Sequence, residues 1–129
     1  MEFMTVKEIN IQLIHLVKNE RKLTQEILNH INLFEKCAGH LSLGYSSMHQ
    51  YLTRELGYSD DQAFRRLKAA RLLNHVPEVA DKLRTGSLNL SQAAQAQRAF
   101  EIAERETGKP VTVESKKNIL NSLANANNF

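Results

Sequence analysis

A regular apolar stripe through the first forty residues constrains the fold of this chain more than any other feature. Its apolar members recur at alternating three- and four-residue steps, and two polar residues, Glu20 and His30, fill the remaining positions of the same repeat. The stripe consists of Val6, Ile9, Leu13, Leu16, Leu23, Ile27 and Phe34, and it is widened on one side by Ile14, Val17, Leu28 and Ile31. The spacing predicts one long helix, or two end-to-end helices, over residues 6–38.

The ends of this segment are also marked in the sequence. Thr5 and Glu8 have the spacing of a capping box, and the pattern stops at Ala38-Gly39. A stripe this wide must be covered, either by the rest of the chain or by a second copy of it. We therefore assign residues 1–39 to a long N-terminal helix that either faces the core or forms a homodimer. The first three residues are expected to be a leader before a native start at Met4.

Glycine, proline and capping residues divide the rest of the chain into shorter helices. After a connector over residues 40–45, helices are expected at roughly 47–56, 60–75, 78–84, 91–107 and 113–123. Ser91 is the expected N-cap of the fourth of these, and the tail from Ala124 onward is expected to fray. The sequence thus predicts an all-α protein of about six helices. Its core spans residues 40–108, and residues 109–129 form a C-terminal helix and tail.

The segment from Gln50 to Arg71 has the pattern of a helix-turn-helix. Gly57 lies where the first helix must stop, because glycine adopts the left-handed backbone conformation without steric cost. Ser59 is a favourable N-cap for the second helix, and Gln62 follows at the spacing of a capping box. The sequence therefore predicts two helices joined by a tight turn, over roughly residues 47–75.

The second of these helices carries several basic residues and no acidic residue from Gln62 to His75. A helical wheel places Ala63, Phe64, Leu67 and Ala70 on the face that packs against the preceding helix, while Arg65, Lys68 and Ala69 point outward. Recognition helices read base edges with their first turns, and flanking arginines hold phosphates. We therefore expect this helix to bind double-stranded DNA. Base edges are expected to be contacted by Gln62, Arg65 and Lys68, and phosphates by Arg66 and Arg71.

Two observations oppose this interpretation. Asp60 and Asp61 suit the positive end of the helix dipole, but they repel a DNA backbone that approaches there. A row of arginines is also a common solvated helix face. The alternative that we keep open is a helical protein-interaction or oligomerisation module that does not bind nucleic acid.

Composition limits the other classes of function. The formal net charge is +3 and the pI is about 9.1, which is mildly basic and weak evidence for a nucleic-acid partner on its own. The single cysteine, Cys37, excludes an internal disulfide and favours a reducing compartment, so a cytoplasmic protein is expected. No apolar run approaches the roughly 20 residues that span a bilayer, and no signal-peptide pattern is present. We expect no membrane partner.

Two resemblances cover part of the chain. The order of Leu56-Gly57-Tyr58-Ser59, Pro77-Glu78-Val79 and Gly86-Ser87-Leu88 around an arginine-rich helix resembles the helix-turn-helix region of ParB-type partition proteins. Residues 40–100 are also similar to the helical region before the nuclease domain of bacterial HNH endonuclease-like proteins, which share a Gly-Tyr-Ser-Ser stretch, here Gly44 to Ser47. This second resemblance implies a bacterial DNA-targeting region that belongs to an HNH-type nuclease whose catalytic domain is absent here.

The catalytic residues of that family find no counterpart in this sequence. An HNH site needs a histidine base and further metal-binding groups in a ββα element, whereas the histidines here are scattered over predicted helices and one connector, at positions 15, 30, 40, 49 and 75. Cys37 and His40 have C-x-x-H spacing without two further zinc ligands nearby, so a half-buried cysteine at a helix end is expected. The sequence predicts no enzyme, no metal or other cofactor and no small-molecule substrate.

Overall fold

The computed structural model describes residues 3–127, and within this range it has seven helices and no strand. The predicted all-α class is therefore confirmed, with one helix more than expected. Of the proposed leader and tail, Met1, Glu2, Asn128 and Phe129 lie outside the described residues. The helices are α1 Val6–Lys36, α2 Gly39–Ser42, α3 Met48–Arg54, α4 Asp60–His75, α5 Val79–Thr85, α6 Leu90–Thr107 and α7 Val113–Ala126.

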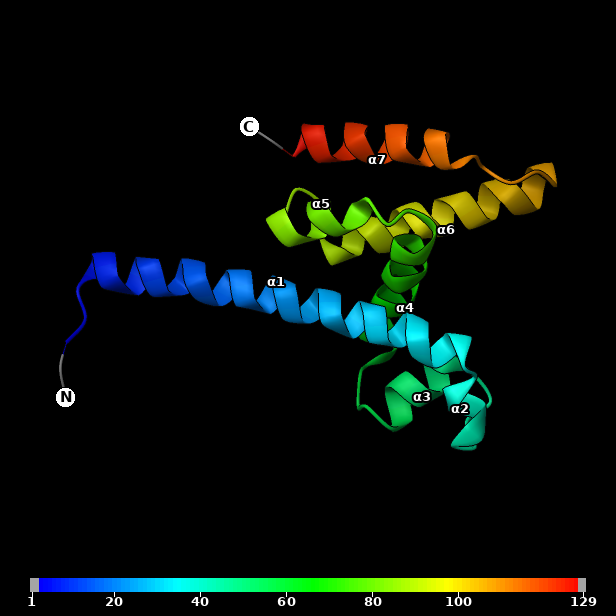
Figure 1. Cartoon of the computed structure of the whole chain (residues 1–129), viewed down its shortest axis with the longest axis horizontal. Helices are drawn as coiled ribbons and strands as arrows, with labels where there is room; N and C mark the ends of the chain where they lie inside the picture. The colour runs from blue at the N-terminus through cyan, green and yellow to red at the C-terminus, as the bar shows by residue number, and fades with distance from the viewer. Residues whose placement is uncertain (1–2, 128–129) are drawn as a thin grey trace.

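Helix α4 lies at the centre of the molecule. Helix α1 crosses it on one side and continues over α5, α6 packs along it, and α3 packs against its N-terminal half. Helix α7 returns beside α6 in the opposite direction, as Figure 1 shows. The largest fully buried side chains come from α1, α3, α4, α5, α7 and the segments on either side of α5, namely Leu28, Leu52, Leu72, Leu88, Leu120, Val76 and Val79. One continuous core therefore joins the helix-turn-helix to the helices that follow it.

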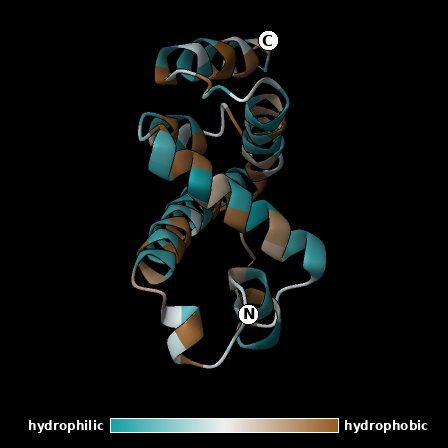
Figure 2. Ribbon diagram, turned by 90° about the vertical axis from the view of Figure 1, so that its right-hand side faces the viewer, coloured by the Kyte–Doolittle hydropathy of each residue, from teal (hydrophilic) through white to brown (hydrophobic). Residues whose placement is uncertain are grey.

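Small side chains are buried on both α4 and α6, which pack along each other. Ala63, Ala69 and Ala70 of α4 and Ala93 of α6 are fully buried in the core. Side chains this short let two helix axes approach closely. Brown and teal bands alternate along the helices in Figure 2, as is usual for amphipathic helices that bury one face. The position of α4 is thus set by close packing and not by a loose contact.

The helix boundaries differ from the prediction at three places. The connector expected at residues 40–45 contains the one-turn helix α2, which follows Ala38 in a left-handed conformation at φ +53°. Helix α6 is capped by Asn89 and not by Ser91, because the Asn89 side chain accepts a hydrogen bond from the Gln92 backbone at 2.8 Å. Helix α7 continues to Ala126, since Ala124 is buried against the core and holds the last turn in place.

The largest departure concerns α1, which forms as one helix with the predicted Thr5–Glu8 capping box. Of the two expected ways to cover its stripe, packing against the rest of this chain is not seen for most of its length. Only Leu28 and Ile31 of this helix are buried, and every described residue before Arg21 is exposed. Helix packing needs a facing partner, and the rest of the chain reaches only the C-terminal half of α1. The stripe from Val6 to Leu23 is therefore left in solvent.

Candidate nucleic-acid interface

Helices α3 and α4 form the predicted helix-turn-helix, joined by residues 55–59. Gly57 has the left-handed conformation at φ +77°, as expected for the residue that ends α3. Ser59 caps α4 by accepting from the Gln62 backbone at 3.2 Å, and the Ser59 backbone donates to the Gln62 side chain at 3.0 Å. Leu52 on α3 and Ala63 on α4 are fully buried. The turn and the capping box are confirmed.

Gln62, Arg65 and Arg66 lie together in the first two turns of α4. Gln62 is exposed, while Arg65 and Arg66 are partly buried. The guanidinium of Arg66 lies 4.5 Å from the centre of the Tyr58 ring, and its Nη1 donates to the Gln62 carbonyl oxygen at 3.2 Å. Within residues 3–127, neither arginine makes an ion pair with a carboxylate. Their charges are therefore available to an external anion.

Lys68 and Arg71 are held differently. The Lys68 Nζ lies 2.6 Å from Glu101 Oε2 of α6, and the Arg71 guanidinium donates to both carboxylate oxygens of Glu35 of α1 at 3.4 and 3.1 Å. Neither of the two acidic partners comes from α4 itself. These two basic residues tie α4 to its neighbouring helices and do not join Arg65 and Arg66 in one exposed ridge.

The ion pair with Lys68 also lowers the pKa of the Glu101 carboxyl group. Burial would raise its pKa, but hydrogen bonds from Lys68 and Gln97 together with the Lys68 charge outweigh burial and hold the pKa below its ordinary value. Glu101 is therefore ionised at neutral pH, and the positive charge of Lys68 is balanced within the fold. A phosphate would have to compete with this carboxylate for Lys68.

The outward face that the helical wheel assigns to α4 is not open along its length. Ala69, expected to point outward beside Arg65 and Lys68, is fully buried. The reason is that α6 packs along α4 and α1 crosses it, so that most of the C-terminal half of α4 lies in the core. The exposed residues of α4 lie at its two ends, at positions 60–62 and 74–75, and Arg65 and Arg66 next to the first group are partly buried.

Asp60 and Arg98 change the charge near the N-terminal half of α4. The carboxylate of Asp60 lies 3.6 Å from the imidazole of His49 on α3, which offsets its charge when the histidine is protonated. Arg98 of α6 lies with its guanidinium carbon 5.7 Å from the Phe64 ring centre, and thereby brings a further cation to α4. Sequence reasoning missed Arg98 because it is far from α4 in the chain and follows no motif there.

Other predicted features are placed as follows. Cys37 is exposed at the C-terminal end of α1, and not half-buried, because the chain turns away from it into α2. Among residues 3–127, no three histidine, cysteine or acidic side chains cluster as metal ligands, and no helix is long and apolar enough to cross a membrane.

Comparison with known proteins gives no match to a family model, to a curated protein or to a solved structure.

Proposed function

We propose that this chain is a cytoplasmic DNA-binding module that contacts double-stranded DNA with the N-terminal half of α4. The observation that carries the proposal is the position of Arg65 and Arg66, which lie in the first two turns of a capped helix and form no ion pair with a carboxylate among residues 3–127. Arginine guanidinium groups bind phosphates and guanine edges with paired hydrogen bonds. Gln62 in the first turn of the same helix is the third contact residue.

Lys68 and Arg71 support this surface without touching the DNA. Their ion pairs with Glu101 and Glu35 hold α4 against α6 and α1, and so fix the direction in which its N-terminal end points. A bound duplex would then meet a rigid helix end, which costs less conformational entropy than a mobile one. The contact set proposed from the structure is therefore smaller than the set expected from sequence.

So few basic contacts predict weak binding by one copy. Sequence-independent binding through a small number of phosphates has dissociation constants of about 10⁻⁴ to 10⁻⁶ M at physiological salt. A homodimer would present two such helix ends to two half-sites, which lie about 34–36 Å apart when one helical turn separates them. We propose that the chain works in this form, as the targeting part of an HNH-type nuclease, and does not itself cleave DNA.

The test is the binding of a fluorescent mixed-sequence duplex at low salt, followed by anisotropy. Replacing Arg65 and Arg66 together by Ala is expected to weaken binding at least tenfold and to flatten the dependence of affinity on salt. The matched control replaces Arg105 and Lys109 by Ala, because it removes the same charge from an exposed site at the far end of α6. Equal losses in both variants, or no binding at high micromolar protein, would refute the proposed interface.

Cleavage is tested with the same duplex in the presence of Mg²⁺ or Mn²⁺. The expected result is intact duplex after prolonged incubation. Cutting that co-purifies with the chain and is abolished by a chelator would show that the chain is an enzyme after all.

A second candidate function is favoured by a different observation. Ten of the exposed large apolar side chains among the described residues lie on α1. Exposed apolar surface of this extent usually marks a protein interface. The protein-interaction alternative therefore has its own support, and it need not compete with DNA binding because it uses another part of the molecule.

A further inference from the structure

Helix α1 consists of two halves with different surroundings. The half from Arg21 to Lys36 packs on α4 and α5, whereas the half from Val6 to Glu20 projects away from the body, as Figure 1 shows. The apolar residues of the projecting half are open to solvent, with Leu13 and Leu16 at 56% and 59% exposed. This projecting half has nothing to pack against within residues 3–127, yet it keeps the apolar stripe of a packed helix.

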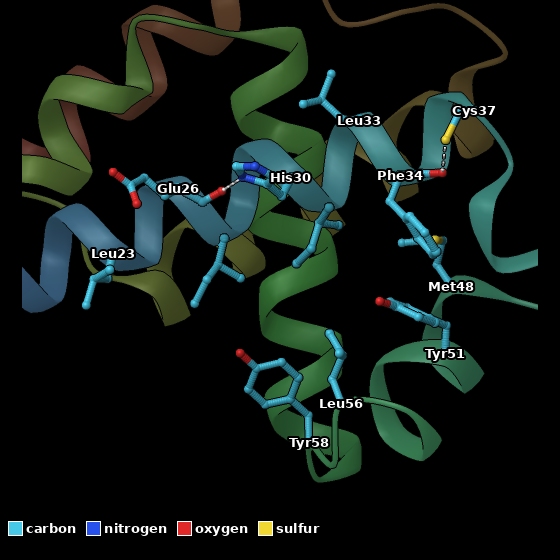
Figure 3. Close-up of a pocket in the computed structure, with 12 residues that line it drawn as sticks. Leu23, Glu26, His30, Leu33, Phe34, Cys37, Met48, Tyr51, Leu56 and Tyr58 are labelled. Carbon is cyan, nitrogen blue, oxygen red and sulfur yellow. Dashed lines mark hydrogen bonds between the residues drawn. The ribbon is translucent and has the colours of Figure 1, made fainter. Parts of the chain in front are cut away.

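A hydrophobic groove of about 590 Å³ lies beside the other half of α1, between this helix and the α3–α4 turn. Figure 3 shows Leu56 and Tyr58 on the side of the turn, and Phe34 and Tyr51 at one end with their ring centres 4.4 Å apart. Leu23 lies at the opposite end of the groove from Cys37. Leu23 and Ile27 belong both to the groove and to the exposed stripe, so groove and stripe form one apolar face.

We propose that a second copy of this chain covers this face, with the two α1 helices antiparallel. The projecting half of each α1 then lies in the groove of the other copy, and each copy supplies both a helix and a groove. Such an interface is self-complementary about a two-fold axis, which closes the assembly at two copies. The proposal gives the homodimer named above its interface, and it holds whether or not the chain binds DNA.

The groove beside α1 determines the direction of pairing, and the repeat on α1 supplies the contacts. The alternating three- and four-residue steps of this repeat are those of a coiled-coil seam, where facing side chains interlock. In a parallel pair, the two projecting halves would face each other and both grooves would stay uncovered. An antiparallel pair has its two-fold axis near Arg21, the midpoint of α1, and places each projecting half over the groove of the other copy.

The residues that flank the seam on the projecting half allow two identical copies to meet. Asn10, Gln12, Val17 and Asn19 occupy these flanks, and none is charged. Flanking charges normally select a different partner or exclude the same one. Without them, no like-charge contact opposes self-association along this half of the helix.

The available area is also adequate. About ten half-exposed apolar side chains on the stripe and in the groove offer on the order of 500 Å² of apolar surface per copy. The polar side chains around them bring the face to roughly the 800 Å² per partner that a stable interface buries. A helix of the length of α1 spans about 46 Å, so its projecting half can extend about 22 Å over the second copy.

The first test measures mass by analytical ultracentrifugation of the full chain without DNA, from about 1 to 100 µM. A dimer of twice the 14.7 kDa chain mass is expected. Leu16→Glu is expected to raise the dimer dissociation constant at least tenfold, while Lys18→Glu, on the opposite face of the same turn, leaves it unchanged. Circular dichroism checks that both variants keep their helix content. A wild-type monomer at 100 µM, or a larger assembly, would overturn the proposal.

The second test determines the direction with the native thiol. Cys37 is exposed at one end of the groove, and Ile9 lies on the projecting half. Antiparallel pairing predicts that a short bis-maleimide links two Ile9→Cys chains, and that adding Cys37→Ser abolishes the link. Efficient linkage of the Ile9→Cys, Cys37→Ser chain would instead place the two Ile9 positions side by side and refute the antiparallel arrangement. The DNA experiment plays no part in either outcome, so the two proposals can fail separately.

Discussion

The ion pair between Lys68 and Glu101 provides a quantitative test of how α4 is fixed. Its N···O distance is 2.6 Å, and the two side chains are only 18% and 26% exposed. At this distance the Coulomb attraction is about 6 kcal/mol for an effective dielectric constant of 20. Desolvation and lost side-chain freedom oppose most of it, so we expect a net coupling of about 1–3 kcal/mol.

A double-mutant cycle with Lys68→Met and Glu101→Gln measures this coupling from urea unfolding at pH 7. The pair between Arg84 and Asp81 is a suitable control, because its N···O distance is also 2.6 Å but its side chains are 56% and 74% exposed. Solvent screens such a pair, so its coupling should not exceed about 0.5 kcal/mol. Equal coupling in the two pairs would contradict the argument from burial.

The pH dependence has a definite sign. The pKa of Glu101 is lower in the folded chain than its ordinary value, so the folded state binds fewer protons than the unfolded state between the two pKa values. The stabilisation by Glu101 is therefore complete above the ordinary carboxyl pKa of about 4.3 and is lost as the pH falls through the folded value. Coupling that stayed the same at pH 7 and pH 3 would refute this assignment.

Two further predictions concern the turn and the packing of α4. Gly57→Ala should destabilise the fold by about 1 kcal/mol, measured as a lower Tm. An added Cβ meets no atom within 4 Å, so the loss of stability comes only from the left-handed backbone conformation. An unchanged Tm would show that the turn tolerates another conformation. Ala69→Leu should destabilise by about 1–3 kcal/mol in urea unfolding, because a larger side chain overfills the fully buried site, whereas Ala99→Leu on the exposed face of α6 should have little effect. Similar values for both substitutions would mean that α4 and α6 are not closely packed at Ala69.

The local features of this fold could be predicted because they depend on residues a few positions apart. The capping boxes at Thr5 and Ser59 and the turn at Gly57 were all visible in the sequence, and the structure confirms each of them. The same holds for the end of α6 at Gly108, which has a left-handed backbone. Signals of this kind need no knowledge of tertiary contacts.

The long-range features could not be predicted from local patterns. Lys68 and Arg71 looked like free cations, because their partners Glu101 and Glu35 are 33 and 36 residues away in the sequence. The alanines of α4 gave no sign that α6 would cover them. In α1 the spacing of the apolar residues predicted the helix. That spacing does not tell whether the apolar face packs against the same chain or against another molecule. The predicted turn and capping box are therefore confirmed, whereas Lys68 and Arg71 form ion pairs within the fold that the sequence did not predict.

The unequal surroundings of α1 imply a gradient of local stability along a single helix. Backbone hydrogen bonds near Leu28 and Ile31 break only when the core opens, since both side chains are buried in it. The turns near Val6 have no tertiary contact in one copy, and a lone helix of about 15 residues is only marginally stable in water. Successive turns can therefore unwind from the N-terminus while the rest of the molecule stays folded, and amide hydrogen exchange should slow progressively from Val6 towards Leu28.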